Sequence, residues 1–206
     1  ISAKDVAKRQ PAKLAALEAH YKTSTHAGFV FGGIPNNKTE QVDYAIHVPG
    51  LLSYLAHGDF NAEVIGLDKF PKEERPPVVI THVAFQIMIL SGCLLALAGL
   101  LFIIFSTRWK NILGKKWWLV FIAWLTPIGF IAVEAGWTVT ETGRQPWIIY
   151  GVMKTKDAVS TMPGLQYSFY SIMAVYVLLT IIIIWLMRKH IARLQTDYPS
   201  AKIETE

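Results

Sequence analysis

Residues 76–107 read PPVVITHVAFQIMILSGCLLALAGLLFIIFST and contain no Asp, Glu, Lys or Arg in 32 consecutive positions. The hydrocarbon core of a bilayer is about 30 Å thick, and a helix of about 20 apolar residues crosses it. This stretch is long enough to do so. It therefore predicts a membrane-spanning helix over residues 78–107.

Two further stretches have the same character. Residues 158–187 contain no Asp, Glu, Lys or Arg in 30 positions, and residues 117–140 contain only Glu134 in 24 positions. Hydrophobic residues make up 52% of the 206-residue chain and charged residues only 17%. This composition excludes a soluble globular enzyme and, despite the net charge of +5, a nucleic-acid binder. We expect an all-α integral membrane protein with three transmembrane helices, at residues 78–107, 117–144 and 165–187.

Basic side chains predict how these helices are oriented. Residues 108–116 carry four Lys or Arg side chains, and residues 188–206 begin with a second basic run. Short segments rich in Lys and Arg remain in the cytoplasm, whereas long polar segments are translocated regardless of their charge. We therefore predict a cytoplasmic loop at 108–116 and a cytoplasmic tail at 188–206. The polar segment 1–77 and the loop 145–164 are then extracytoplasmic.

The polar segment 1–77 is expected to be an ordered lid or docking loop. Pro11 suits the first position of a helix, and apolar residues recur at helical spacing as far as Tyr21. Residues 51–57 form a second predicted short helix, which Gly58 closes. No internal repeat or separate domain is predicted in this segment.

Met88, His82, Lys13 and Glu18 can each be interpreted either as structural residues or as part of a ligand site. Met88, within the first span, is either a packing residue or an axial ligand to haem iron, because a thioether can do both. His82 is expected to hydrogen-bond locally rather than to bind a metal. Lys13 and Glu18 are either a solvated helix face or two sides of a ligand site. Being about 140° apart around a helix, they do not converge on one point unless the helix bends.

The second span carries ionisable side chains at membrane depth, where they are costly and usually face a cavity or a partner. Glu134 and Glu141 are seven residues apart and share one helix face, with Trp137 between them. Arg144 follows one turn beyond Glu141. One interpretation is an interfacial Glu141–Arg144 ion pair with Trp137 in the aromatic belt. Glu134 lies deeper and fits a proton relay, a cation partner or a metal ligand.

A motif at the end of this span favours a functional role for these residues over an interfacial ion pair. Residues 136–147 read GWTVTETGRQPW and closely resemble the GWxxxExGRQPW signature of subunit I of cytochrome bd quinol oxidases. AVEAGW at 132–137 and YGVMKT at 150–155 extend the match. KLAALE at 13–18 and GIP at 33–35 resemble that family's quinol-binding loop, and FQIM at 85–88 resembles its methionine-ligand segment. The resemblance covers the C-terminal part of the subunit, so the three helices are expected to belong to a larger helical bundle.

The resemblance implies roles for four residues around two haems. Glu141 is implied as the axial ligand of the high-spin haem b, and Met88 as one axial ligand of the low-spin haem b. Trp137 is implied to assist electron transfer, and Arg144 to pair with a haem propionate. Gln86 departs from the pattern, because many family members carry Arg two residues before the ligating Met.

The resemblance also implies an activity, oxidation of membrane quinol and reduction of O2 to water. Lys13 and Glu18 match loop residues implicated in quinol oxidation, and the reaction is electrogenic without proton pumping. Haem d and its histidine ligand belong to the remainder of subunit I, so this segment alone is not sufficient. The resemblance implies subunit II as a partner, and a small single-span subunit is compatible with it as a second partner. The implied location is a prokaryotic plasma membrane.

Two other functions stay open. The chain is alternatively a haem-free assembly subunit, in which Glu134 and Glu141 pair with basic groups of a partner. It is also compatible with a proton-coupled transporter fragment that uses the same carboxylates as a relay. Haem content separates the oxidase from both, and proton-coupled uptake separates the transporter from the assembly subunit.

Overall fold

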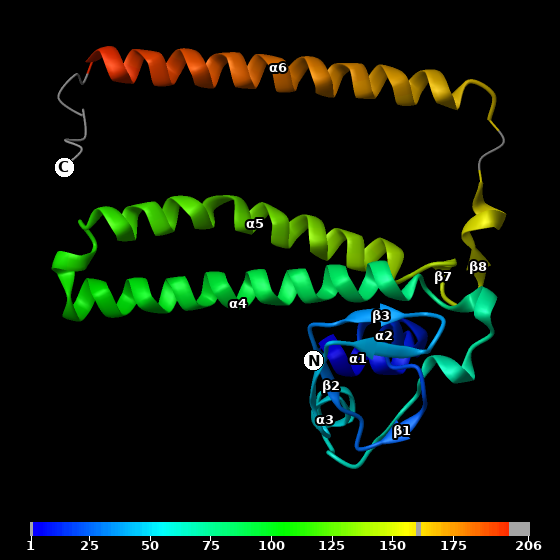
Figure 1. The fold of residues 1–206 in the computed structure, drawn as a ribbon. Coiled ribbons are helices and arrows are strands. Elements are labelled where there is room, and N and C mark those ends of the chain that lie inside the picture. Colours follow the sequence, from blue (N-terminus) through cyan, green and yellow to red (C-terminus); the bar gives the residue numbers. More distant parts are fainter. Residues whose placement is uncertain (1, 160–161, 198–206) are drawn as a thin grey trace. The chain divides into compact units, whose positions relative to one another are not determined.

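A computed structural model describes residues 2–159 and 162–197 (Figure 1), and the end of the predicted cytoplasmic tail lies outside the described residues. The chain divides into two compact units, Ile1–Val159 and Ser160–Glu206. Three helices are long and apolar enough to cross a membrane. They are α4 (Val78–Arg108) and α5 (Lys116–Thr142) in the first unit and α6 (Leu165–Asp197) in the second. The predicted helical membrane fold with three spans is confirmed.

The N-terminal segment (residues 2–77) contains three short helices and short antiparallel strand pairs. The helices are α1 (Ser2–Arg9), α2 (Pro11–Leu17) and α3 (Leu51–His57). The pairs are β1 (Ser24–Thr25) with β6 (Glu63–Val64), β2 (Phe29–Phe31) with β5 (Ile46–Val48), and β3 (Ile34–Asn36) with β4 (Gln41–Asp43).

Both predicted short helices are present, and their ends have local causes. Pro11 begins α2, as predicted, but α2 ends earlier than expected, at Leu17. Glu18 caps it, and Ala19 has a left-handed φ of 47°, which turns the chain out of the helix. The second helix, α3, ends at Gly58, whose φ of 87° is the left-handed conformation that glycine adopts without strain.

The N-terminal segment packs on the first turns of α4. Its buried core consists of small and apolar side chains from α2, α3, the strands and the connection between β1 and β2: Leu14, Ala27, Phe29, Leu52, Ala56 and Val64. Phe85 and Ile89 of α4 pack against this core. At a second junction Leu17 of α2, Ala84 of α4 and Val139 of α5 are buried together. Apolar burial therefore holds the segment against both membrane helices of the first unit.

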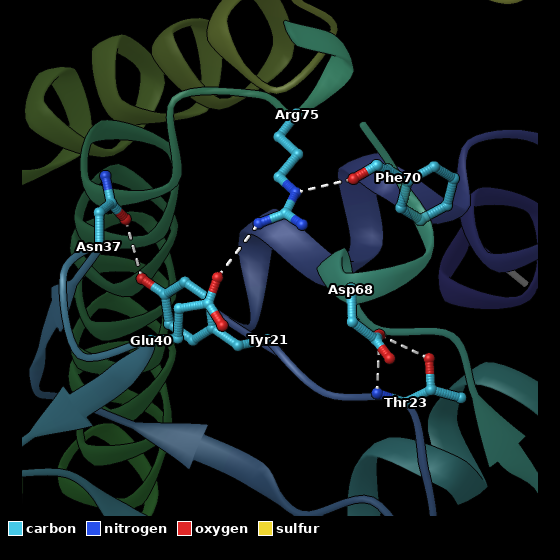
Figure 2. A network of polar contacts seen from close by, with 7 residues as sticks. All are labelled: Tyr21, Thr23, Asn37, Glu40, Asp68, Phe70 and Arg75. Carbon is cyan, nitrogen blue, oxygen red and sulfur yellow. Dashed lines mark hydrogen bonds and ion pairs between the residues drawn. The ribbon is translucent and has the colours of Figure 1, made fainter. Parts of the chain in front are cut away.

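Polar contacts brace the segment where it leads into α4 (Figure 2). The Nε of Arg75 donates to the Phe70 carbonyl at 2.9 Å, and its Nη1 lies 3.3 Å from Oε1 of Glu40. The Tyr21 hydroxyl donates to Oδ1 of Asn37 at 2.9 Å. These contacts tie together parts of the segment that are distant in sequence.

Helices α4 and α5 run side by side as an antiparallel pair, joined by a short turn at η3 (Lys110–Ile112) (Figure 1). Several of their buried positions are small: Ala84, Ser91 and Ala98 on α4, and Ala135 on α5. Small residues let membrane helices approach closely. The chain leaves α5 through the antiparallel pair β7 (Trp147–Ile149) and β8 (Met153–Lys154).

Candidate functional site

The thioether of Met88 lies at the contact between α4 and α5. A Cβ atom placed on Gly136 would lie 3.4 Å from the Met88 sulfur. Gly136 is followed directly by Trp137, so Met88 meets α5 one residue before the tryptophan. Met88 therefore packs against Gly136, as its interpretation as a packing residue predicts. This contact joins the motif at 85–88 to the motif at 136–147, almost fifty residues further along the chain.

The face of α5 that bears Glu134, Trp137 and Glu141 is exposed within the first unit. Trp137 is 69% exposed, and both carboxylates are exposed as well. The spacing of three and then four residues places them on one side of the helix. Glu134 also lines an apolar groove of about 620 Å³ between α4 and α5, together with Phe130 and Ile87. Exposed carboxylates on a membrane helix call for a partner that shields them from lipid.

Lys13 of α2 reaches the end of α5. Its Nζ donates to the Thr140 carbonyl at 3.4 Å, and its side chain lies over Gly143, where a Cβ would be 3.1 Å from Cε of Lys13. Burial, and next the positive charge of Arg144, lower the pKa of the Lys13 ammonium, whereas the negative charge of Glu141 raises it. The structure thus brings Lys13, Glu141 and Arg144 together at one end of α5.

Arg144 has a buried nitrogen that lacks a partner. It follows Gly143, which caps α5, and so lies outside the helix. Its Nε is buried without a hydrogen-bond partner among the described residues. Among the residues that the structure describes, the ion pairs are Arg75–Glu40 and Lys154–Glu74, so the alternative Glu141–Arg144 ion pair is not formed. A buried donor without an acceptor costs about 1–3 kcal/mol, so this nitrogen calls for an acceptor from outside the described chain.

Glu18 is in a different environment from Lys13. It is only 2% exposed and accepts a hydrogen bond from the Val30 amide at 3.4 Å. Burial raises the pKa of its carboxyl to about 8, although the Val30 bond acts in the opposite direction. Lys13 instead contacts the end of α5, so the two side chains do not converge on one point, as their spacing predicts.

Two buried side chains of α4 bind the backbone of the N-terminal segment. His82 is fully buried, with Nδ1 2.7 Å from the Leu17 carbonyl and Nε2 3.2 Å from the Gly32 carbonyl. Both ring nitrogens of His82 therefore lie within hydrogen-bond distance of backbone carbonyls of the N-terminal segment. Gln86 donates to the Val30 carbonyl at 2.7 Å and accepts from the Gly32 amide at 3.2 Å.

In the sequence, Gln86 stands out only as a departure from a family pattern, and that departure does not predict these bonds. The one available signal was spacing: His82 and Gln86 are four residues apart and therefore lie on one face of an otherwise apolar helix start. This spacing indicates a shared polar contact but does not identify its partner.

Comparison with known proteins shows to which family the chain belongs. The family model of cytochrome bd terminal oxidase subunit I matches residues 1–195. The chain belongs to this family. The cytochrome bd subunit I family is one of membrane proteins, and the chain is accordingly a multi-pass membrane protein.

Individual relatives agree with the family match. The bd oxidase structure from Geobacillus thermodenitrificans is 36% identical with a TM-score of 0.79, covering 93% of this chain and 44% of that one. A Bacillus subtilis (strain 168) relative, named as a candidate cytochrome bd menaquinol oxidase subunit I, is 36% identical over 88% of this chain and 42% of its own length. Cytochrome bd ubiquinol oxidase subunit 1 of the same strain is 31% identical over 94% and 44%. The chain therefore spans less than half the length of these relatives.

The described residues fit the haem cofactors that the family implies. The unpartnered Nε of Arg144 is a donor that a carboxylate such as a haem propionate can satisfy. Glu141 and Trp137 lie on a face that the first unit leaves exposed, and Met88 supplies a thioether. Thioether and oxygen side chains are known haem ligand types in proteins.

Proposed function

We propose that the chain forms the C-terminal part of subunit I in a cytochrome bd-type terminal oxidase of a prokaryotic plasma membrane. The complete complex oxidises membrane quinol and reduces O2 to water, and this segment alone is not sufficient. The observation that carries the proposal is the buried, unpartnered Nε of Arg144 beside Lys13 and Glu141. An anionic cofactor group at this end of α5 explains why the nitrogen is buried without an acceptor.

Four residues have proposed roles toward the haems, which supply one-electron redox chemistry when bound. Met88 would hold the low-spin haem b through its thioether sulfur, and Glu141 would hold the high-spin haem b through its carboxylate. Arg144 donates to a propionate, which balances the negative charge. Trp137 lies between the position where Met88 meets α5 and the position of Glu141, one turn further on, so it is suited to assist electron transfer. Haem d is held by the remainder of subunit I.

Glu18 and Lys13 have proposed roles in quinol oxidation. A general base is most effective when its pKa lies near the working pH, and the pKa of Glu18 is about 8. Glu18 therefore takes a proton from a quinol hydroxyl and passes it to the side of the membrane that the N-terminal segment faces. Lys13 anchors α2 at the end of α5 and contributes positive charge there.

We further propose that the N-terminal segment and the loop after α5 are extracytoplasmic, with the basic turn between α4 and α5 in the cytoplasm. Protons from quinol are then released outside, and protons for water formation enter from the cytoplasm. This makes the reaction electrogenic without a pump. The proposed partners are the remainder of subunit I, subunit II and a small single-span subunit.

The test is a reduced-minus-oxidised absorption spectrum of the purified complex that contains this chain. Met88→Leu is expected to lose the low-spin haem b signal selectively, and Glu141→Ala the high-spin signal. Met173 and Glu63 are both exposed and provide matched controls. Met173→Leu and Glu63→Ala are expected to leave both signals intact. A complex without haem would contradict the oxidase and favour the assembly subunit, or the transporter if proton-coupled uptake is found.

A further inference from the structure

We infer that His82 and Gln86 are positioning residues for quinol oxidation, which fix Glu18 and the loop beside it to the helix that carries Met88. This inference rests on the proposed function, because it assumes that Glu18 acts on quinol. It gives a role to Gln86, which stands where many family members carry Arg.

The two side chains form a clamp, which consists of His82 and Gln86 with their four polar contacts to the N-terminal segment. His82 lies within hydrogen-bond distance of carbonyls in two separate pieces, Leu17 at the end of α2 and Gly32 after β2. Gln86 uses its amide in both directions, donating to the Val30 carbonyl and accepting from the Gly32 amide. The clamp therefore restrains the chain on both sides of Glu18.

Glu18 is connected to the clamp through Val30. The Val30 amide donates to Oε2 of Glu18, and the Val30 carbonyl accepts from Gln86. Leu17, whose carbonyl contacts His82, directly precedes Glu18. One contact thus holds the Glu18 carboxyl and another holds the backbone directly before it, and each leads back to a side chain of α4.

Because His82 and Gln86 are buried, losing their bonds to the N-terminal segment is expected to be costly. His82 is 0% exposed and Gln86 6% exposed, so water cannot easily replace the bonds when they are lost. Gln86 is also two residues before Met88 on the same helix. The N-terminal segment and the proposed haem ligand Met88 are therefore both attached to α4. This helix, rather than the segment alone, fixes the distance between them.

The test uses Gln86→Leu and His82→Phe in the complete oxidase complex. Each variant keeps a side chain of similar size but loses its bonds to the loop. The expected result is a rise of about fivefold or more in KM for quinol, the loss that one buried hydrogen bond predicts. The haem spectrum, and the oxidase rate with a small water-soluble reductant that does not need the quinol loop, are expected to be unchanged. Amide hydrogen exchange at Val30 and Gly32 is expected to accelerate.

Matched controls and a partial variant sharpen the result. Gln41→Leu and His57→Phe make the same changes at exposed positions of the N-terminal segment and are expected to leave KM unchanged. Gln86→Glu keeps the acceptor for the Gly32 amide but loses the donor to the Val30 carbonyl. The KM for quinol is therefore expected to rise in this variant as well. Unchanged quinol KM in Gln86→Leu, or equal loss of activity with quinol and with the soluble reductant, would overturn the positioning role. A wild-type complex without haem would instead overturn the proposed function.

Discussion

The sulfur of Met88 on α4 lies in contact with Gly136 on α5, at the residue before Trp137. This contact joins the two membrane helices at the position where their motifs meet. Since Glu141 lies one turn beyond Trp137, the two proposed haem ligands are linked through a single stretch of α5. The absence of a side chain at Gly136 leaves the space that the thioether occupies.

Gly136→Val is therefore expected to displace Met88. The Cβ position is already 3.4 Å from the sulfur, and the two methyl groups of valine reach further, an overpacking that costs about 1–3 kcal/mol. The low-spin haem b signal of the complex measures the effect and is expected to fall. Gly136→Ala, whose Cβ makes an ordinary contact, is expected to keep it. Gly129→Val is the control, because nothing lies within 4 Å of that Cβ position; equal loss in both valine variants would contradict the contact's role.

Arg144→Met is expected to lower the midpoint potential of the high-spin haem b. A cation beside a propionate favours the reduced cofactor, which carries less positive charge, and methionine removes that cation. Spectroelectrochemical titration of the complex measures the shift. Arg108→Met removes an exposed cation at the end of α4 and is the control. An unchanged potential in Arg144→Met would show that the unpartnered Nε does not face the haem.

Quinol oxidation is expected to speed up with pH as Glu18 ionises. Because its pKa is about 8, the carboxyl is mostly protonated at pH 7 and becomes an available base only as the pH approaches 8. The value of kcat/KM for quinol should rise between pH 6 and 8 (about tenfold per unit well below the pKa) and then level off. Glu18→Gln is expected to be slow at every pH. A pH rise that survives in this variant would assign the base elsewhere.

The same shift affects stability, with a definite sign. The raised pKa means that the folded state holds the Glu18 proton more tightly than the unfolded state does. The free energy of unfolding therefore falls as pH rises from 4.5 to about 8, by up to about 1.4 kcal/mol per pH unit. Thermal unfolding of the complex, followed across this range, is expected to be less pH-dependent in Glu18→Gln. Glu63→Gln, at an exposed position, is expected to behave like wild type.

Trp137→Phe is expected to slow electron transfer between the haems. The substitution keeps an aromatic ring but shortens the side chain that lies between the Met88 contact and Glu141. Flash-induced re-oxidation kinetics of the complex measure the rate. Trp124→Phe is the control, since Trp124 is 75% exposed on the same helix. Wild-type kinetics in Trp137→Phe would exclude an electronic role for Trp137.

Local patterns predicted much of this molecule, because each depends on neighbours in sequence. The charge-free stretches predicted three helices, since a helix satisfies its own backbone in lipid whatever surrounds it. The spacing of Glu134, Trp137 and Glu141 predicted one shared face, and that of Lys13 and Glu18 predicted that they diverge. These predictions need only the 3.6-residue period of the helix.

The contacts that define the candidate site were decided by tertiary structure alone. His82 and Gln86 bind the backbone of residues 50 to 65 positions away. Every residue carries the same backbone groups, so no sequence pattern identifies which amide or carbonyl a side chain meets. The unpartnered Nε of Arg144 and the raised pKa of Glu18 likewise follow from burial, which depends on how α2 lies against α4 and α5. The sequence by itself determined the helices and their polar faces, and only the packing of the N-terminal segment on them decided which polar groups are buried and which partners they have.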